Sequence, residues 1–135
     1  MEDTTKRAES KTVLLKESRL RLLRLHKLLV DIERDSYEKR NGKITGGQFL
    51  NLLLTEQDFQ WLRKFSILIV DIDEMFDLDD GFDEVMIERH LSEMRKIVEF
   101  KTPDAEFNDK YRSFLEHRSD AADKNSEIKM LLSDV

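Results

Sequence analysis

Apolar positions recur every three or four residues along the first third of the chain. This periodicity predicts one long amphipathic helix over about Glu9 to Arg40. Asn41-Gly42 follows, and glycine readily adopts the left-handed conformation that ends helices. We expect residues 1–8, which precede the pattern, to be disordered. The predicted buried face carries Leu14, Ser18, Leu22, Leu25, Leu29, Ile32 and Ser36.

The most apolar part of the chain is residues 59–76, FQWLRKFSILIVDIDEMF. A helix this apolar must be covered on nearly every side, so we expect it to be the central helix of a bundle, ending near Leu78. Thr55 to Asp58 resembles a capping box that would start it. Its main seam repeats at the three- and four-residue spacing of helix bundles, with Leu62, Phe65, Ile69, Ile72 and Phe76.

Shorter patterns predict the remaining helices. Residues 48–54 form a short apolar helix, and residues 82–100 form a longer amphipathic one. Thr102-Pro103-Asp104 is typical of a helix start, with a hydroxyl N-cap and proline at the first position. Residues 118–135 are expected to be a polar tail with a possible short helix. The sequence therefore predicts an all-α, up-and-down four-helix bundle over residues 9–117, with an additional short helix.

Composition narrows the chemistry that the chain can perform. Its 135 residues suit one domain, and the absence of cysteine excludes disulfides, thiolate zinc sites and cysteine nucleophiles. The N-terminal residues have no apolar segment typical of a secretory signal. The longest strongly apolar run, residues 65–70, is too short to span a bilayer and contains Ser66. We expect a cytoplasmic protein that makes no contact with membranes.

Charge is unevenly distributed along the chain. The net charge of −6 disfavours nucleic acid as a partner. Residues 16–27 hold five basic residues and one acid, whereas residues 71–88 hold nine acids and no Lys or Arg. Five of these acids crowd the C-terminal end of the predicted central helix, where the helix dipole disfavours them. Either cations of the first helix neutralise them, or they form a docking surface for a basic partner.

Known metal-binding and catalytic motifs do not occur. A di-iron bundle needs Glu three residues before a ligating His. Leu23, Ile87 and Phe114 stand there instead, before His26, His90 and His117. No H-E-x-x-H, EF-hand, phosphate-binding glycine loop or G-x-S-x-G is present. The sequence therefore predicts no cofactor.

A few polar residues lie on predicted apolar faces. His26 and Glu33 fall on the buried face of the first helix, and Ser66 and Asp73 lie at the edge of the central one. We expect these four to form a cluster, with Tyr37 or Arg63 beside it. The cluster is either a hydrogen-bond network that fixes helix register or an acid–base or ligand pocket. A metal held by its carboxylates and His26 is a third alternative.

A longer motif spans residues 25–76. It contains Leu25-His26-Lys27, Glu33-Arg34 and Tyr37-Glu38, then Phe49-Leu50, Trp61-Leu62-Arg63, Ser66 and Ile72-Asp73-Glu74. This pattern, LHK…ER..YE…FL.LL…F.WLR..S.LI..IDE, resembles a family of small bacterial helical proteins with no assigned activity. The family usually has proline where this chain has Lys64. The resemblance adds weight to His26, Glu33, Arg63, Ser66 and Asp73 without separating a folding role from a catalytic one.

Two functions are consistent with these patterns. The first is a protein-interaction or regulatory module, bound to a protein partner or paired as a homodimer. The second is a small enzyme or ligand-binding bundle that uses the His26, Glu33, Ser66 and Asp73 cluster. The second function requires a solvent-connected hollow that touches at least three of these four residues.

Overall fold

The computed structural model of the chain describes residues 2–133. Within them lie six α-helices, one 3-10 helix and no strand, which confirms the predicted all-α class. The elements are α1 (Glu2–Asn41), α2 (Gly46–Thr55), η1 (Gln57–Leu62), α3 (Arg63–Phe76), α4 (Glu84–Val98), α5 (Ala105–Glu116) and α6 (Ser119–Ser133).

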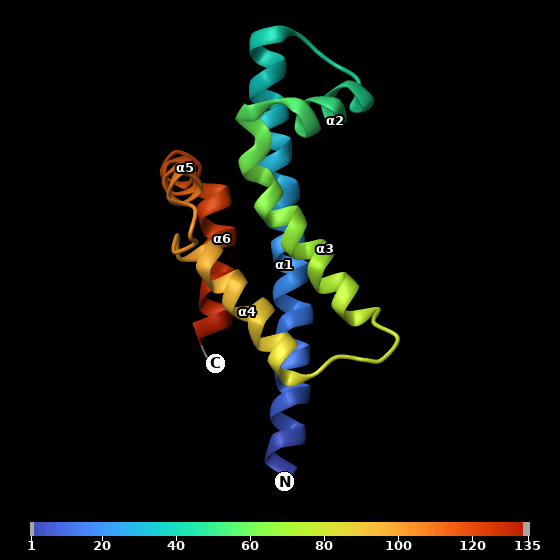
Figure 1. Ribbon diagram of the computed structural model, residues 1–135. Helices are drawn as coiled ribbons and strands as arrows, with labels where there is room; N and C mark the ends of the chain where they lie inside the picture. Colours follow the sequence, from blue (N-terminus) through green and yellow to red (C-terminus); the bar gives the residue numbers. More distant parts are fainter. Residues whose placement is uncertain (1, 134–135) are drawn as a thin grey trace.

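The long helix α1 is the axis on which the other helices pack (Figure 1). It contacts η1, α3, α4 and α6, and α4 also contacts α3 and α6. At 1.5 Å per residue, a helix of 40 residues is about 60 Å long, whereas one of 15 residues is only about 22 Å long. Several shorter helices therefore share the task of covering its apolar face.

The predicted apolar stripes form the core. The predicted stripe of α1 is fully buried at Ser18, Leu22, Leu25 and Leu29, with Leu15 beside it, whereas Leu14 is only partly buried and Ser36 is exposed. The Ser18 hydroxyl donates to the Leu15 carbonyl at 3.1 Å, so its burial leaves no unpaired donor. On the facing side, the seam of the central segment is buried at Leu62, Phe65, Ile69 and Ile72.

The central helix starts differently from the prediction. The capping box lies at Thr45 and Gln48, which exchange side-chain and backbone hydrogen bonds of 3.1 and 2.9 Å, and it starts α2. Thr55 instead ends α2, where its hydroxyl donates to the Asn51 carbonyl. The chain then forms η1, a 3-10 helix, and becomes α-helical at Arg63. Thr45 was missed because Gly46 and Gly47 resemble a loop.

The start of α5 is also shifted from the prediction. Its N-cap is Asp104, whose carboxylate accepts a 3.0 Å bond from the Phe107 backbone. Pro103 therefore precedes the cap. Thr102 does not cap the helix; its hydroxyl donates to Asn108 Oδ1 at 2.7 Å, and Asn108 donates back to the Thr102 carbonyl.

Both ends of the chain differ from the prediction of disorder and a loose tail. Residues 2–8 belong to α1, while Met1 lies outside the described residues. Residues 119–133 form α6, which packs on α1, α4 and α5. Polar residues obscured this helix in the sequence, because its buried face includes a polar side chain: Ala121, Asn125, Ile128 and Leu132.

A buried polar network joins α4, α5 and α6. The hydroxyl of Tyr111, which is fully buried, donates to Asn125 Oδ1 at 2.7 Å. Asn125 Nδ2 donates in turn to the Val98 carbonyl at the end of α4, at 3.1 Å. Burial without a compensating charge raises the pKa of Tyr111, so its hydroxyl stays protonated and able to donate. The network therefore fixes α6 against the other two helices.

We predict that Tyr111→Phe lowers the free energy of unfolding by about 1–3 kcal/mol, because it leaves the Asn125 carbonyl oxygen buried without a donor. Asn125→Ala should lower the free energy of unfolding further, since the Tyr111 hydroxyl and the Val98 carbonyl then both lose their partner. Urea unfolding of the single and double variants measures both effects, and the double variant should lose less than their sum. Ser126→Ala, exposed on α6, is the matched control. An unchanged unfolding free energy for Tyr111→Phe would contradict this role.

Candidate functional site

The predicted polar cluster does not assemble, because α1 runs antiparallel to η1 and α3. Four contacts define the register: Arg19 with Asp73, His26 with Phe65, Glu33 with Trp61, and Tyr37 with Phe59. Later residues of α1 therefore lie opposite earlier residues of α3 and η1. His26 lies opposite the start of α3, whereas Asp73 lies near its end, about 10 Å further along the helix. The prediction that these residues meet was wrong.

Asp73 is held by an arginine of α1. The Arg19 guanidinium forms two hydrogen bonds to its carboxylate, of 2.7 and 2.9 Å, and this pairing raises the pKa of Arg19. Ser66 donates to the Arg63 carbonyl of its own helix at 3.1 Å. Arg63, unplaced by the sequence, donates through Nη2 to the Leu54 carbonyl and so ties α3 to α2. The side chains of Asp73, Ser66 and Arg63 are therefore bonded within the fold and not to one another.

The two aromatic members of the predicted cluster pack against the core. The His26 imidazole lies against the Phe65 ring, with 6.3 Å between the ring centroids. Its burial lowers the pKa of His26, so burial favours the neutral ring. The Tyr37 ring meets Phe59 edge to face.

Glu33 lines a hollow between α1 and α5. Its carboxylate accepts a 3.4 Å bond from Trp61 Nε1, and burial raises the pKa of Glu33 against the opposing effects of that bond and of Lys110 and Arg40. The hollow, of about 390 Å³, also has Ser36, Ser113 and His117 in its lining. His26, Ser66 and Asp73 are absent from the hollow. The requirement that at least three of the four residues share one hollow is therefore not met there.

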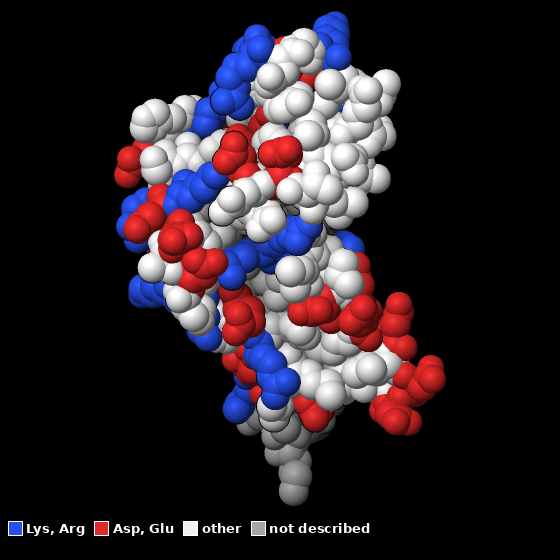
Figure 2. All heavy atoms as spheres, turned by 45° about the horizontal axis from the view of Figure 1, so that its top comes forward, with Lys and Arg blue, Asp and Glu red and all other residues white. Residues whose placement is uncertain are grey.

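Cations of α1 neutralise part of the acidic segment. Lys11 lies 2.8 Å from Glu84 and 2.9 Å from Glu88, and Arg19 pairs with Asp73. The acidic residues of the α3–α4 connection, Asp77, Asp79 and Asp80, are exposed. Figure 2 shows one group of acidic side chains projecting at the lower right of the molecule, with others spread over the rest of the visible face. Of the five acids at the C-terminal end of the predicted central helix, the ion pair with Arg19 neutralises only Asp73, while Glu84 and Glu88, which Lys11 neutralises, belong to α4.

The outer face of α3 carries a second pattern that the sequence reading missed. Arg63, Ile67, Val70 and Glu74 follow one another at four-, three- and four-residue spacing and all are exposed. The exposed fractions of Ile67 and Val70 are 57% and 51%. The prediction that this helix is covered on nearly every side is therefore wrong along this row. A helical wheel that separates this row from the buried seam would have found it.

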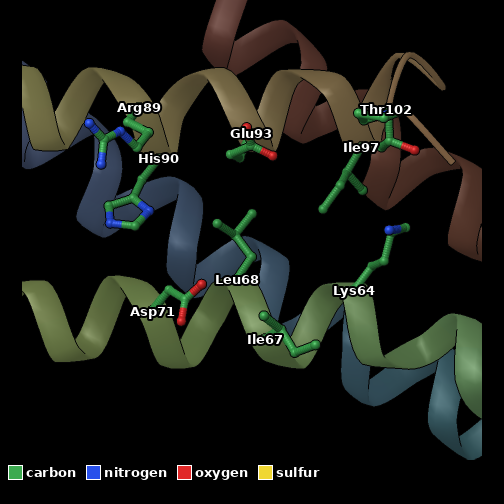
Figure 3. A pocket seen from close by; sticks show the side chains of 10 residues that line it. Lys64, Ile67, Leu68, Asp71, Arg89, His90, Glu93, Ile97 and Thr102 are labelled. Atoms are coloured by element: carbon green, nitrogen blue, oxygen red, sulfur yellow. The ribbon is translucent and has the colours of Figure 1, made fainter.

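A groove of about 320 Å³ runs between α3 and α4 beside this row (Figure 3). Apolar side chains from both helices, including Leu68 and Ile97, line it. His90 of α4 and Asp71 of α3 point toward one another across one end. Burial lowers the pKa of His90, and the charge of Asp71 opposes that effect. The groove thus has an apolar interior and charged edges of both signs, with Lys64, Asp71, Arg89 and Glu93 among its lining residues.

A second, more polar hollow of about 470 Å³ lies among η1, α3 and α5. It shares Lys64 and Ile67 with the α3–α4 groove. The Ile67 side chain therefore lies where the two hollows meet. The two hollows and the exposed row of α3 together make one continuous surface, which we call the α3 surface.

Two other kinds of site, a metal centre and a membrane-spanning helix, are not found in the part of the chain that the structure describes. No three or more His, Asp or Glu side chains are grouped so that they could hold a metal ion. No described helix has the length and apolar character needed to cross a bilayer. Comparison with models of known protein families, with curated proteins and with solved structures finds no match. The resemblance of residues 25–76 to a bacterial helical family stays a prediction.

The buried position of Glu33 leads to a prediction about pH. Because the folded state raises its pKa above the ordinary value of 4.5, the ionised carboxylate destabilises the fold at neutral pH. We expect Glu33→Gln to increase the free energy of unfolding at pH 7. This gain should shrink as the pH falls through the folded pKa toward 4.5 and below.

Urea unfolding at a series of pH values measures this difference. Glu116→Gln, exposed on α5, controls for the loss of one negative charge. A stabilisation by Glu33→Gln that grew as the pH fell would contradict the assignment.

Proposed function

We propose that this chain is a protein-interaction module and that the α3 surface is its binding face. In this proposal α6, which lies beyond the predicted bundle of residues 9–117, takes the place of α5 as the fourth helix beside α1. The helices α1, α3, α4 and α6 then act as an up-and-down four-helix bundle that holds the surface rigid, in the cytoplasm. The groups that would indicate catalysis have separate partners along α1 and α3, whereas the α3 surface combines exposed apolar side chains with two hollows.

The exposure of Ile67 and Val70 is the observation that carries the proposal. Both lie in the middle of a helix whose other face is tightly packed, at positions where a polar side chain would leave the core unchanged. Because each side chain is already about half buried, covering the rest of one in an interface removes apolar surface worth roughly 1 kcal/mol from water. Contiguous apolar residues with a polar rim are typical of protein-binding surfaces.

The shape of the surface favours a helix as the bound element. A groove between two neighbouring helices accepts the apolar face of a third, whose side chains at positions i, i+3, i+4 and i+7 fill it. The edges supply Lys64 and Arg89 for acidic groups of the ligand, and Asp71 and Glu93 for basic ones. Such edges orient the bound helix more than they strengthen binding.

The alternative function, a small enzyme or ligand-binding bundle, now has less support. Of its four proposed residues, only Glu33 lines the hollow near His117. The Asp73 carboxylate is bonded to Arg19, and the Ser66 hydroxyl donates to the Arg63 carbonyl of its own helix.

Photo-crosslinking in cells of the source organism tests the proposed function. We expect a photoreactive amino acid at position 67 to form covalent adducts with another protein molecule, because Ile67 would be buried in the interface. The same group at Met130, which is 71% exposed on α6, is the matched control and should form few adducts. If position 67 gave no more adducts than position 130, the α3 surface would not be a binding face.

A further inference from the structure

We propose that the α3 surface binds a second copy of this chain, through antiparallel pairing of the two α3 helices about a two-fold axis. This inference rests on the proposed function and names its partner. It derives from the order of side chains along the exposed row. Reading from the N-terminal end, the row has a cation, two apolar residues and an anion: Arg63, Ile67, Val70 and Glu74.

This order is complementary to its own reverse. When two α3 helices lie antiparallel, Arg63 of each chain faces Glu74 of the other, and Ile67 faces Val70. A two-fold interface requires such self-complementarity, because the same patch is used on both molecules. The four- and three-residue spacing of the row is that of helices packed nearly parallel or antiparallel. Parallel pairing would instead place Arg63 against Arg63 and Glu74 against Glu74.

The two charges cannot satisfy one another within a single chain. Arg63 and Glu74 are eleven residues apart on one helix, which corresponds to about 16 Å along its axis. Among the described residues, neither Glu74 nor Arg63 takes part in an ion pair, and Arg63 donates to the Leu54 carbonyl. Glu74 also lies near the C-terminal end of α3, where the helix dipole disfavours an anion. A cation from a second copy would offset that effect.

The apolar pattern continues beyond both charges. Leu54 of α2, 58% exposed, lies next to Arg63 through the bond to its carbonyl. Leu78, 46% exposed, follows Glu74 in the α3–α4 connection. Antiparallel pairing brings Leu54 of each copy toward Leu78 of the other. A specific interface generally buries at least about 1,000 Å² in total, so these ends are needed in addition to the α3 contact.

Charge reversal tests this geometry. Arg63→Glu makes both ends of the row acidic, and Glu74→Arg makes both ends basic. Each single variant then brings like charges together twice in its own dimer, so we expect its dimer dissociation constant to rise by about tenfold or more. The double variant Arg63→Glu/Glu74→Arg restores opposite charges and should dimerise like the wild type.

A mixture of the two single variants gives the sharpest result. In a mixed pair, every acidic end faces a basic end, so the two weakly associating proteins should form a heterodimer when combined. Sedimentation velocity over a range of concentrations and at low salt measures all five samples. No contact within one chain can produce the rescue in the mixture, because the substituted residues are then on different molecules.

Matched controls separate weak pairing from a damaged fold. Glu74→Arg replaces an exposed anion near a helix C-terminus with a cation, and should not lower the thermal unfolding midpoint. Arg63→Glu removes the bond to the Leu54 carbonyl, so Ile67→Glu serves as an independent variant that also weakens the dimer. Met130→Glu on α6 should dimerise like the wild type.

The outcomes distinguish this inference from the proposed function. A wild-type protein that stays monomeric at all concentrations, or single variants that dimerise normally, would overturn the antiparallel homodimer. If the photo-adducts at position 67 then contain a different protein, the α3 surface is still a binding face and only its partner has been misassigned. If position 67 gives no specific adducts at all, both proposals fail.

Discussion

The length of α1 is the constraint on which the rest of the structure depends. Its buried stripe runs from Leu15 to Ile32, and no other helix among the described residues is long enough to cover it alone. The chain therefore packs several helices onto one axis, with η1 and α3 covering one side and α4 and α6 others. The Tyr111–Asn125–Val98 network is a consequence of this division, because separate covering helices must also be fixed to one another.

The same constraint determines where the polar residues lie. Because η1 and α3 fold back along α1, each polar side chain of α1 meets the residue opposite it in the antiparallel register. Arg19 therefore neutralises Asp73, and Trp61 donates to Glu33, two turns of α1 beyond His26. Groups that a shared active site would bring together are instead distributed along the axis. The inner face of α3 is used for folding, and its outer face remains available for binding.

Sequence reasoning predicted most helices and their buried stripes, although both predicted N-caps, at Thr55 and Thr102, were wrong. Periodicity located the buried stripes, and the helix breaks at Gly42 and Gly81 coincide with left-handed backbone, φ 88° and 81°. A helical wheel placed Ser66 and Asp73 at the edge of the apolar face of the central helix. It could not identify the residues opposite them, because the register of two helices depends on the whole connection between them. The face of α6 was missed because Asn125 is buried by virtue of partners on other helices. The exposed Ile67 and Val70 were not foreseen, because the apolar character of the segment was taken to require cover on nearly every side, although folded surfaces also contain many apolar atoms.

The α3 surface combines two features that folding alone does not require. Polar residues at positions 67 and 70 would leave the packing of the isolated chain unchanged, since more than half of each side chain lies in solvent. An anion at Glu74 is unfavourable beside the C-terminal carbonyls of α3, and no described cation pairs with it. The exposed apolar side chains and the unpaired Glu74 lie in the same row of α3. A single antiparallel contact would bury the former and pair the latter with a cation. Because a single arrangement accounts for the apolar exposure and for the order of charges, it explains more than a chance placement of surface residues would.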